Sequence, residues 1–212
     1  KSGNILRTFN KKSGLKSNNV KNLYLDANGD LWAPLNNGIA LIKLSSTFEF
    51  INELQNFEGM GYGSLLQNDT LFLGGSQGLY FSPNWSTSRG KAFQKIEGLR
   101  FINSNIKAFK GNILCADEHE AYELIDRKFK RISDGNGMSA WIFKRIPNVD
   151  TLLLCGTYED LRIYAYRKGH WVFRNVIAGF IESARMFEFD SKGVLWVVQG
   201  ISGLFKIKLD KD

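Results

Sequence analysis

The sequence holds few of the residues from which catalytic and metal sites are commonly built. It has 2 histidines and 2 cysteines among 212 residues, and it has no Gly-x-Ser-x-Gly elbow, phosphate-binding loop or paired-carboxylate signature. Two cysteines without a histidine cluster make no zinc site. No run of about 18 apolar residues is present, so we expect no membrane span in this segment. These absences disfavour an enzyme, and we expect no cofactor and no bound metal.

The chain uses one stretch twice. Residues 26–44 read DANGDLWAPLNNGIALIKL, and residues 190–209 read DSKGVLWVVQGISGLFKIKL. Degenerate copies lie between them, and alignment on the Leu-Trp pair gives five units, with first members at Leu31, Leu71, Ile113, Leu153 and Leu195. Their spacings are 40, 42, 40 and 42 residues. A period of about 41 residues indicates a repeat architecture.

Each unit is predicted to form four short antiparallel strands. The apolar residues within a unit alternate, which indicates half-buried strands, and no window of a dozen residues has the period of an amphipathic helix. Asp-Ala-Asn-Gly at 26–29 and Asn-Asn-Gly at 36–38 are tight-turn sequences, because Asn and Gly accept positive φ. Four strands in every 40 residues or so are typical of a β-propeller blade, whereas HEAT and armadillo arrays of similar period are helical.

The predicted fold is therefore all-β, a β-propeller of four-stranded antiparallel blades with five repeats in a single domain over 1–212. The predicted blades are 20–51, 65–96, 106–132, 141–176 and 184–209. Residues 4–9 resemble the fourth strand of the other units, and the last unit stops after three strands. We expect this N-terminal strand to pair with the C-terminal blade and close the ring, which removes an exposed sheet edge. The alternative is an open arc of a larger propeller with about seven blades.

The first and last units also resemble a known family. The matching residues are Gly14-Leu15, Asn18, Val20, Asp26, Gly29, Leu31-Trp32 and Gly38-Ile39 in the first unit, and Asp190, Gly193, Leu195-Trp196 and Gly203-Leu204 in the last. This pattern is similar to the two-component regulator propeller repeat. The resemblance implies a periplasmic or otherwise extracytoplasmic sensor region of a hybrid sensor histidine kinase that responds to polysaccharide fragments, with the kinase elsewhere in the intact protein. Family members usually carry two propellers of about seven blades, whereas this chain holds five repeats.

The charge of the chain is basic, with a formal net charge of +7 and a pI near 9.4. Lysines are spread along the sequence, which favours solvated turns and protected edges over nucleic-acid binding. An acidic polysaccharide or a membrane surface is a partner that the charge allows and does not require. The absence of an initiator Met and of a signal peptide fits a processed or excised segment.

Neither the cysteines nor the histidines form a recognisable site. Cys115 and Cys155 occupy equivalent places in successive units, which is poor geometry for a disulfide, so we expect buried free thiols. His119 lies in a polar turn, where solvation is a simpler interpretation than metal binding. Propeller lyases and lactonases gather metal ligands or histidines at the central axis, and here the innermost strands are predicted to begin at Asn19, Gly63 or Ser64, Asn105, Ala140 and Ser183. That set makes a lyase or lactonase the least favoured alternative.

A ligand is expected on the loops that join fourth to first strands and second to third strands, because these project on one face around the axis. The candidate ligand-binding residues are Tyr62, Asn105, His119, Trp141, Tyr158, Glu159, Arg185 and Gln199. The predicted function is a non-catalytic sensor module of a two-component signalling system that binds an oligosaccharide or another glycan-derived ligand. The alternative is a protein-interaction or dimerisation scaffold. A carbohydrate and a second copy of the chain are thus the partners considered, and nucleic acid is not expected.

Overall fold

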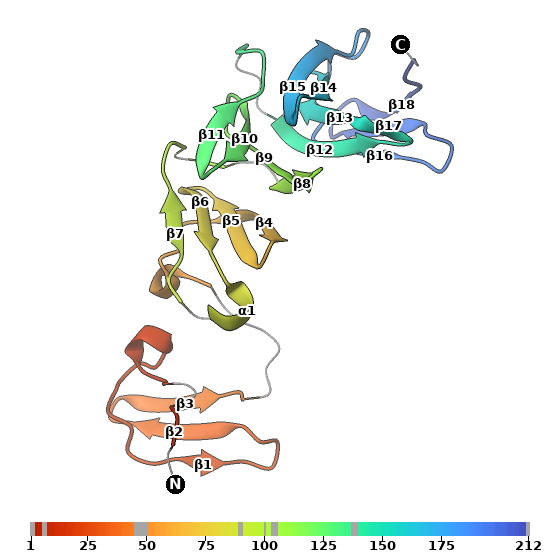
Figure 1. Ribbon diagram of the computed structural model, residues 1–212. Helices are drawn as coiled ribbons and strands as arrows, with labels where there is room; N and C mark the ends of the chain where they lie inside the picture. The colour runs from red at the N-terminus through yellow and green to blue at the C-terminus, as the bar shows by residue number, and fades with distance from the viewer. Residues whose placement is uncertain are drawn as a thin grey trace. The chain divides into compact units, whose positions relative to one another are not determined.

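The computed structural model describes residues 3–5, 8–44, 51–88, 91–99, 101–102, 106–136 and 140–210. These residues are almost entirely β structure, and their strands build five antiparallel sheets of three or four strands each (Figure 1). The predicted all-β, propeller-like class is confirmed. The chain divides into two compact units, residues 1–57 with 89–93 and residues 58–88 with 94–212. A single domain over 1–212 stays a prediction.

The first unit contains one three-stranded sheet. Its elements are η1 (Lys11–Ser13), β1 (Tyr24–Leu25), β2 (Leu31–Leu35), β3 (Gly38–Ile42) and η2 (Glu53–Gln55). The predicted first blade ends at residue 51, and its residues 45–50 lie outside the described residues. The described part of the predicted strand at 4–9 is not in a strand, and residues 6–7 are not described. Closure of a ring by this segment therefore stays a prediction.

The second unit contains four sheets, and in each of them the strands follow one another across the sheet in chain order. The first sheet has β4 (Gly61–Gln67), β5 (Thr70–Gly75), β6 (Gly78–Ser82) and β7 (Gln94–Ile96), with α1 (Trp85–Ser88) before β7. The second has β8 (Lys107–Phe109), β9 (Asn112–Ala116), β10 (Ala121–Ile125) and β11 (Lys128–Arg131). The third has β12 (Ala140–Ile146), β13 (Val149–Thr157), β14 (Leu161–Arg167) and β15 (His170–Val176). The fourth has β16 (Met186–Phe189), β17 (Leu195–Gln199) and β18 (Gly203–Ile207).

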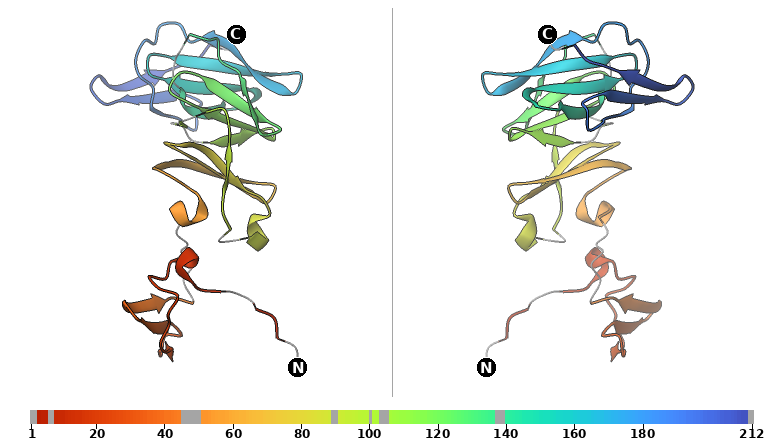
Figure 2. Two further views of the ribbon diagram at one scale, coloured as in Figure 1. Left: turned by 90° about the vertical axis from the view of Figure 1, so that its left-hand side faces the viewer. Right: turned by 90° about the vertical axis from the view of Figure 1, so that its right-hand side faces the viewer.

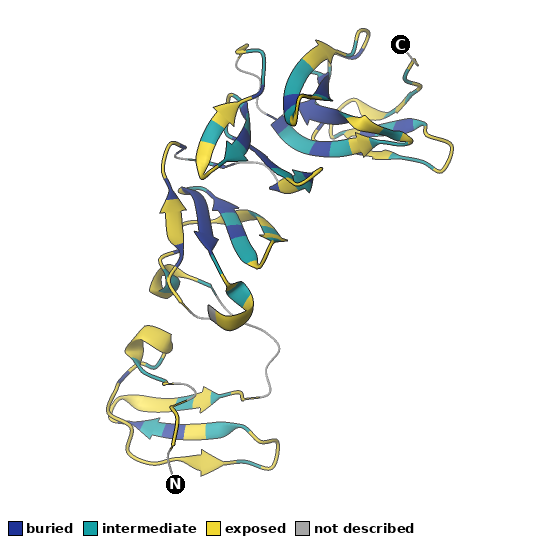
Figure 3. Cartoon of the chain, in the orientation of Figure 1, coloured by how far each residue is buried: buried dark blue, intermediate teal, exposed yellow. Residues whose placement is uncertain are grey.

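The apolar core of the second unit lies between consecutive sheets. One cluster, which includes Leu79 and Ile113, joins the first and second sheets. A second, which includes Leu114 and Phe143, joins the second and third sheets. A third, which includes Leu154 and Phe187, joins the third and fourth sheets. Figure 3 shows the buried residues concentrated in the central strands of the sheets, and both views in Figure 2 show the sheets of this unit in the same succession. Each sheet therefore supplies one wall of the core of its neighbour.

The core of the second unit contains two cysteine thiols and one carboxylate. Cys115 and Cys155 are free and buried, as predicted, and burial raises the pKa of the Cys115 thiol to about 12. Between the second and third sheets, the buried carboxylate of Glu123 lies 3.0 Å from His170 Nδ1 and accepts a hydrogen bond from the amide of Asn112. The two sheets are thus joined by a polar contact as well as by apolar packing.

Four hairpins of the second unit have two-residue loops in which both residues have positive φ. These loops are Asn68–Asp69, Lys110–Gly111, Asp126–Arg127 and Lys168–Gly169. Positive φ at both positions defines the type I′ turn, whose twist matches that of antiparallel strands. The local chain geometry at these turns therefore sets the strand register.

The repeated Asp-x-x-Gly-x-Leu-Trp stretch has the same geometry in both copies. Asp26 Oδ1 accepts two backbone N–H groups of the turn, at 2.9 and 3.0 Å, and Oδ2 accepts the indole N–H of Trp32 at 2.9 Å. Asp190 makes the same three bonds, with the indole of Trp196 at 3.1 Å. The indole bond, followed by the backbone bonds, favours the charged carboxylate and lowers the pKa of both aspartates. The motif is a turn that also orients a tryptophan.

We expect Asp190→Ala to lower the melting temperature at neutral pH, and we expect the difference from the wild type to shrink on acidification. The carboxyl pKa is lower in the folded chain than in the unfolded chain. The stabilisation is therefore complete above the unfolded value of about 4 and is lost as the pH falls through the folded value. Thermal unfolding followed by circular dichroism from about pH 7 down to about pH 3 measures both effects.

Asp150→Ala is the matched control, because the exposed carboxylate of Asp150 makes no hydrogen bond or ion pair within the described part of the chain. A difference between Asp190→Ala and the wild type that stays constant over the pH range would contradict the assignment.

Candidate functional site

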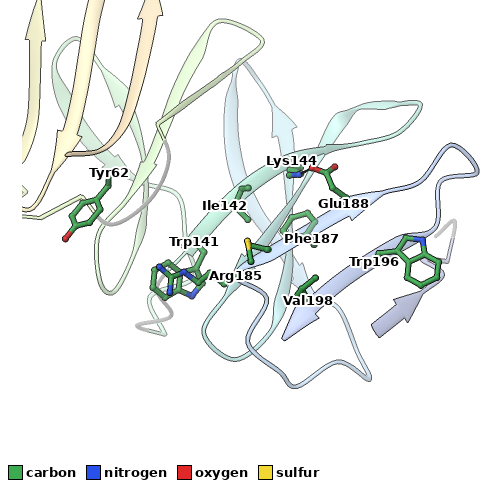
Figure 4. Close-up of a pocket in the computed structure, with 10 residues that line it drawn as sticks. Tyr62, Trp141, Ile142, Lys144, Arg185, Phe187, Glu188, Trp196 and Val198 are labelled. Carbon is green, nitrogen blue, oxygen red and sulfur yellow. Dashed lines mark ion pairs between the residues drawn. The ribbon is translucent and has the colours of Figure 1, made fainter. Parts of the chain in front are cut away.

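A pocket of about 600 Å³ opens at the first strands of three sheets in the second unit (Figure 4). The residues that line it are Tyr62, Trp141, Ile142, Lys144, Arg185, Met186, Phe187, Glu188, Trp196 and Val198. Its volume lies in the range of about 300–1,000 Å³ that is typical of small-molecule sites. The lining is largely apolar and aromatic, with a few charged groups.

The topology explains why these residues meet. The first strand of each sheet lies at one edge of that sheet, and first strands of consecutive sheets lie side by side, as β4 does with β8 and β12 with β16. Tyr62 is the second residue of β4, Trp141 is the second residue of β12, and Arg185 immediately precedes β16. Three equivalent positions in the repeat thus supply the polar and aromatic groups of the pocket.

Two of these residues are the extra residue of a β-bulge. The residues on either side of Tyr62 pair with successive residues of β5, so Tyr62 has no cross-strand partner. The same irregularity occurs in β12, where the neighbours of Trp141 pair with successive residues of β13. A bulge leaves one residue outside the ladder and turns its side chain, and bulges are common beside functional sites. The two rings are therefore displayed by local irregularities at matching places in two sheets.

Trp141 is at the centre of the site. Its ring lies 4.5 Å from the ring of Tyr158, centroid to centroid, at an interplanar angle of 53°. The guanidinium of Arg185 also contacts this ring, and its Cζ lies 4.5 Å from the Trp141 ring centroid. The indole Nε1 is buried and has no hydrogen-bond partner within the described residues. An aromatic pair and a cation thus form one compact surface.

A close approach of two backbone segments fixes Arg185. The N–H of Ala184 donates to the carbonyl of Thr157 at 2.9 Å. A Cβ at Gly156 would lie only 1.9 Å from the carbonyl oxygen of Ala184, so the approach requires glycine. The segment before β16 therefore lies against the end of β13, and this contact places Arg185 beside Trp141.

An ion-pair network holds the turn that carries Tyr158. Arg162 is only 3% exposed and donates from Nε and Nη2 to Asp160, at 2.9 and 3.1 Å, and from Nη1 to Asp134 at 2.6 Å. Thr157 Oγ1 also donates to Asp160 at 2.7 Å. Burial opposes ionisation of Asp134, but hydrogen bonds led by a backbone N–H and the Arg162 guanidinium outweigh it and lower its pKa. Charge-assisted bidentate pairs of this kind are geometrically specific, so the turn is held in one arrangement.

The other two charged groups of the lining form an ion pair with each other. Lys144 forms an ion pair with Glu188 (Figure 4), and its Nζ lies 5.7 Å from the ring centroid of Phe187. Burial, followed by repulsion from Lys107, lowers the pKa of Lys144. The side of the pocket formed by β12 and β16 is thus close to neutral.

The structure brings half of the predicted site residues together. Tyr62, Trp141 and Arg185 line the pocket, and Tyr158 packs on Trp141. The other predicted residues are His119, Glu159, Gln199 and Asn105. The first three of these do not line the pocket, and Asn105 lies outside the described residues.

Hydrogen bonds within the chain close the turns that carry His119 and Gln199. The backbone N–H of His119 donates to Asp117 Oδ1 at 2.8 Å, within a turn closed by that carboxylate. Gln199 Oε1 accepts the backbone N–H groups of Ile201 and Ser202 at 2.5 and 2.7 Å. The acceptors, Asp117 Oδ1 and Gln199 Oε1, thus stabilise their own turns. A ligand role for the side chains of His119 and Gln199 stays a prediction.

The sequence analysis missed Lys144, Glu188 and Trp196 as pocket residues. Their positions follow from which face of β12, β16 and β17 points to the pocket, and the bulge at Trp141 changes that face within β12. Glycine on both sides of Tyr62 is the one signal of a bulge that the sequence carries.

The described residues contain neither a candidate metal site nor a candidate membrane-spanning helix. None of their His, Cys, Asp and Glu side chains form a group of three or more that could hold a metal ion. None of the helices in the described part of the chain has the length and apolar character needed to cross a membrane.

The fold has counterparts among solved structures. A scan against protein-family models and a search of curated proteins give no match. Over 96% of its length, the chain superposes on the extracellular domain of BT3049 from B. thetaiotaomicron, described as a hybrid two-component system, with a TM-score of 0.67 and 15% identity. The extracellular domain of BT4673 from the same organism matches over 93% of the chain, with a TM-score of 0.53 and 17% identity. The WD40 β-propeller domain of Doa1 matches over 83%, with a TM-score of 0.51 and 11% identity.

These similarities concern the fold. The chain covers 29% of the BT3049 domain, 34% of the BT4673 domain and 56% of the Doa1 domain. The predicted similarity to the propellers of two-component sensors is confirmed at the level of the fold, because two of these structures are such extracellular domains.

We expect Gly156→Ala to destabilise the chain by about 3 kcal/mol or more, because the added methyl group meets a backbone carbonyl that cannot rotate away. Chemical denaturation followed by tryptophan fluorescence measures the change. Gly200→Ala is the matched control, since a Cβ there meets no atom within 4 Å. Equal stability of the two variants would show that Ala184 does not approach β13 as described.

Proposed function

We propose that this chain is a non-catalytic ligand-binding part of the extracytoplasmic sensor region of a two-component signalling protein, and that its ligand is an oligosaccharide or another glycan fragment. The observation that carries the proposal is the surface formed by Trp141, Tyr158 and Arg185 in a pocket on a sensor-like propeller fold. The fold similarity to two sensor extracellular domains supports the location and the signalling role.

The chemistry of the pocket suits a sugar. Aromatic rings pack on the apolar C–H face of a pyranose, and the polar edge of tryptophan and tyrosine can bond to hydroxyl groups. Trp141 and Tyr62 supply two such rings from separate sheets, and Arg185 supplies donors beside them. Strands carry the two rings, and a backbone contact between Ala184 and Thr157 holds the segment of Arg185, which lowers the entropic cost of binding.

The same lining supports a binding role over hydrolysis. Glycoside hydrolysis typically uses two carboxyl groups that flank the scissile bond. Glu188 is the one carboxylate among the described residues that line the pocket, and Lys144 holds it in an ion pair. We therefore propose that the pocket recognises its ligand without transforming it.

We expect Trp141→Ala to weaken the binding of an oligosaccharide by about tenfold or more, which is the range for loss of a central aromatic contact. Isothermal titration calorimetry of the 212-residue chain, with a panel of defined neutral and acidic oligosaccharides, measures this. Trp32→Ala is the matched control, since it removes a tryptophan of the first unit that does not line the pocket. Absence of saturable binding to every member of the panel, by a chain that circular dichroism shows to be folded, would count against the proposal.

A second candidate function is a self-association scaffold, which one observation favours. Met186, Val198 and Leu204 are directly opposite one another on β16, β17 and β18 and are all exposed, so they form an apolar row across the fourth sheet. Met186 and Val198 also line the pocket, so a partner on this row would cover part of it. An exposed apolar patch of this kind is typical of a surface that another protein covers. A second copy of the chain would bury it.

We expect Leu204→Lys to reduce self-association measured by sedimentation velocity over a concentration series, because it places a charge in the apolar row. Lys206→Glu serves as a control, since it changes a charge on the same strand outside the apolar row. A wild-type chain that remains monomeric at its highest soluble concentration contradicts this second function.

A further inference from the structure

We infer that the pocket selects an acidic sugar residue, whose carboxylate or sulfate group pairs with Arg185 while its ring packs on Trp141. This inference rests on the proposed function and narrows it from glycans in general to anionic glycans. It depends on the charge of Arg185, on the balance of the other charges, and on an unused donor beside it.

The guanidinium of Arg185 lacks an anionic partner within the described residues. It forms no ion pair or hydrogen bond there, and its recorded contact is with the Trp141 ring at 4.5 Å. Stacking on an aromatic face orients a guanidinium and leaves its N–H donors available. Arg162 shows the contrast, because two carboxylates engage three of its nitrogens in a buried network. Arg185 is therefore a positioned cation with open donors.

No other group in the pocket supplies the missing negative charge. Glu188 is engaged by Lys144, and the remaining described lining residues are uncharged. Lys144 and Glu188 cancel, so Arg185 leaves the lining with one net positive charge. A planar carboxylate or a sulfate matches the fork of a guanidinium, and such pairs are among the strongest hydrogen-bonded contacts in proteins.

A second donor lies beside the guanidinium. Trp141 Nε1 is buried without an acceptor, which is an unfavourable state for an N–H group. Tyr158 and Arg185, whose side chains contact the ring, are both exposed at the surface. A ligand oxygen that reached Nε1 would satisfy the donor, so an acidic sugar could engage the indole and the guanidinium together.

The net charge of the chain acts in the same direction. A formal charge of +7 raises the local concentration of anionic ligands and speeds their association at low ionic strength. This long-range attraction does not determine where on the chain an anion binds. Within the pocket, we infer that the anion binds at Arg185.

The test compares pairs of oligosaccharides that have the same length and sugar sequence and differ in whether they carry an anionic group. Titration calorimetry is carried out on the 212-residue chain with a galacturonic acid oligomer and with its methyl ester, which has the same length and no carboxylate charge. A sulfated oligosaccharide and its desulfated form make a second pair, and these two arms distinguish a carboxylate from a sulfate. Arg185→Gln is compared with Arg145→Gln, because Arg145 is also an exposed arginine near an aromatic ring, 5.9 Å from the Phe109 centroid, and does not line the pocket.

We expect the charged member of one pair to bind about tenfold more tightly than the neutral member. Arg185→Gln is expected to remove this preference, and Arg145→Gln is expected to keep it. Trp141→Phe, which retains the ring and loses the N–H, should weaken the charged ligand by a smaller factor. Equal binding of the charged and neutral members, or a preference that survives in Arg185→Gln, overturns the inference.

The same experiment distinguishes a failure of the acidic specificity from a failure of the proposed glycan-binding function. If a neutral oligosaccharide binds in a Trp141-dependent way and no charged ligand is preferred, the glycan sensor stands and the acidic specificity fails. If no oligosaccharide of either kind binds to the folded chain, the proposed function itself fails.

Discussion

The structure depends on one constraint, which is that a sheet of three or four strands cannot bury both of its faces by itself. The second unit meets it by stacking, since each of its three apolar clusters lies between two consecutive sheets. On the fourth sheet of this unit, Met186, Val198 and Leu204 form an apolar row that is exposed in the described structure. The stability of any sheet in this unit is therefore a property shared with its neighbours.

The same stacking creates the site. The first strand of each sheet lies at one edge of that sheet, and first strands of consecutive sheets lie side by side, as β4 does with β8 and β12 with β16. The polar network around Arg162 and the close contact of Gly156 with Ala184 then fix the two segments that carry Tyr158 and Arg185. The side chains of the pocket are thus placed by contacts within the chain itself.

The sheets could be predicted from the sequence more completely than the residues of the pocket. The spacing of the Leu-Trp pairs was enough to predict sheets of antiparallel strands in series, because alternation and turn residues are local properties. The same reasoning named eight candidate residues from their places in the repeat, and Tyr62, Trp141, Tyr158 and Arg185 are the four that lie in or against the pocket. It could not find Lys144 and Glu188, whose pairing depends on how two sheets pack, nor the indole bond to Asp190, which depends on the rotamer of Trp196. Ring closure depends on long-range pairing, which no local pattern determines.

The bulges at Tyr62 and Trp141 have an evolutionary consequence. A residue that lies outside the hydrogen-bonded ladder contributes little to strand register, so its identity can change while the sheet remains intact. A repeat protein that keeps its recognition residues at such positions can acquire a new preference through single substitutions, one sheet at a time. Diversification of ligand choice and conservation of architecture then become separable traits in the same chain.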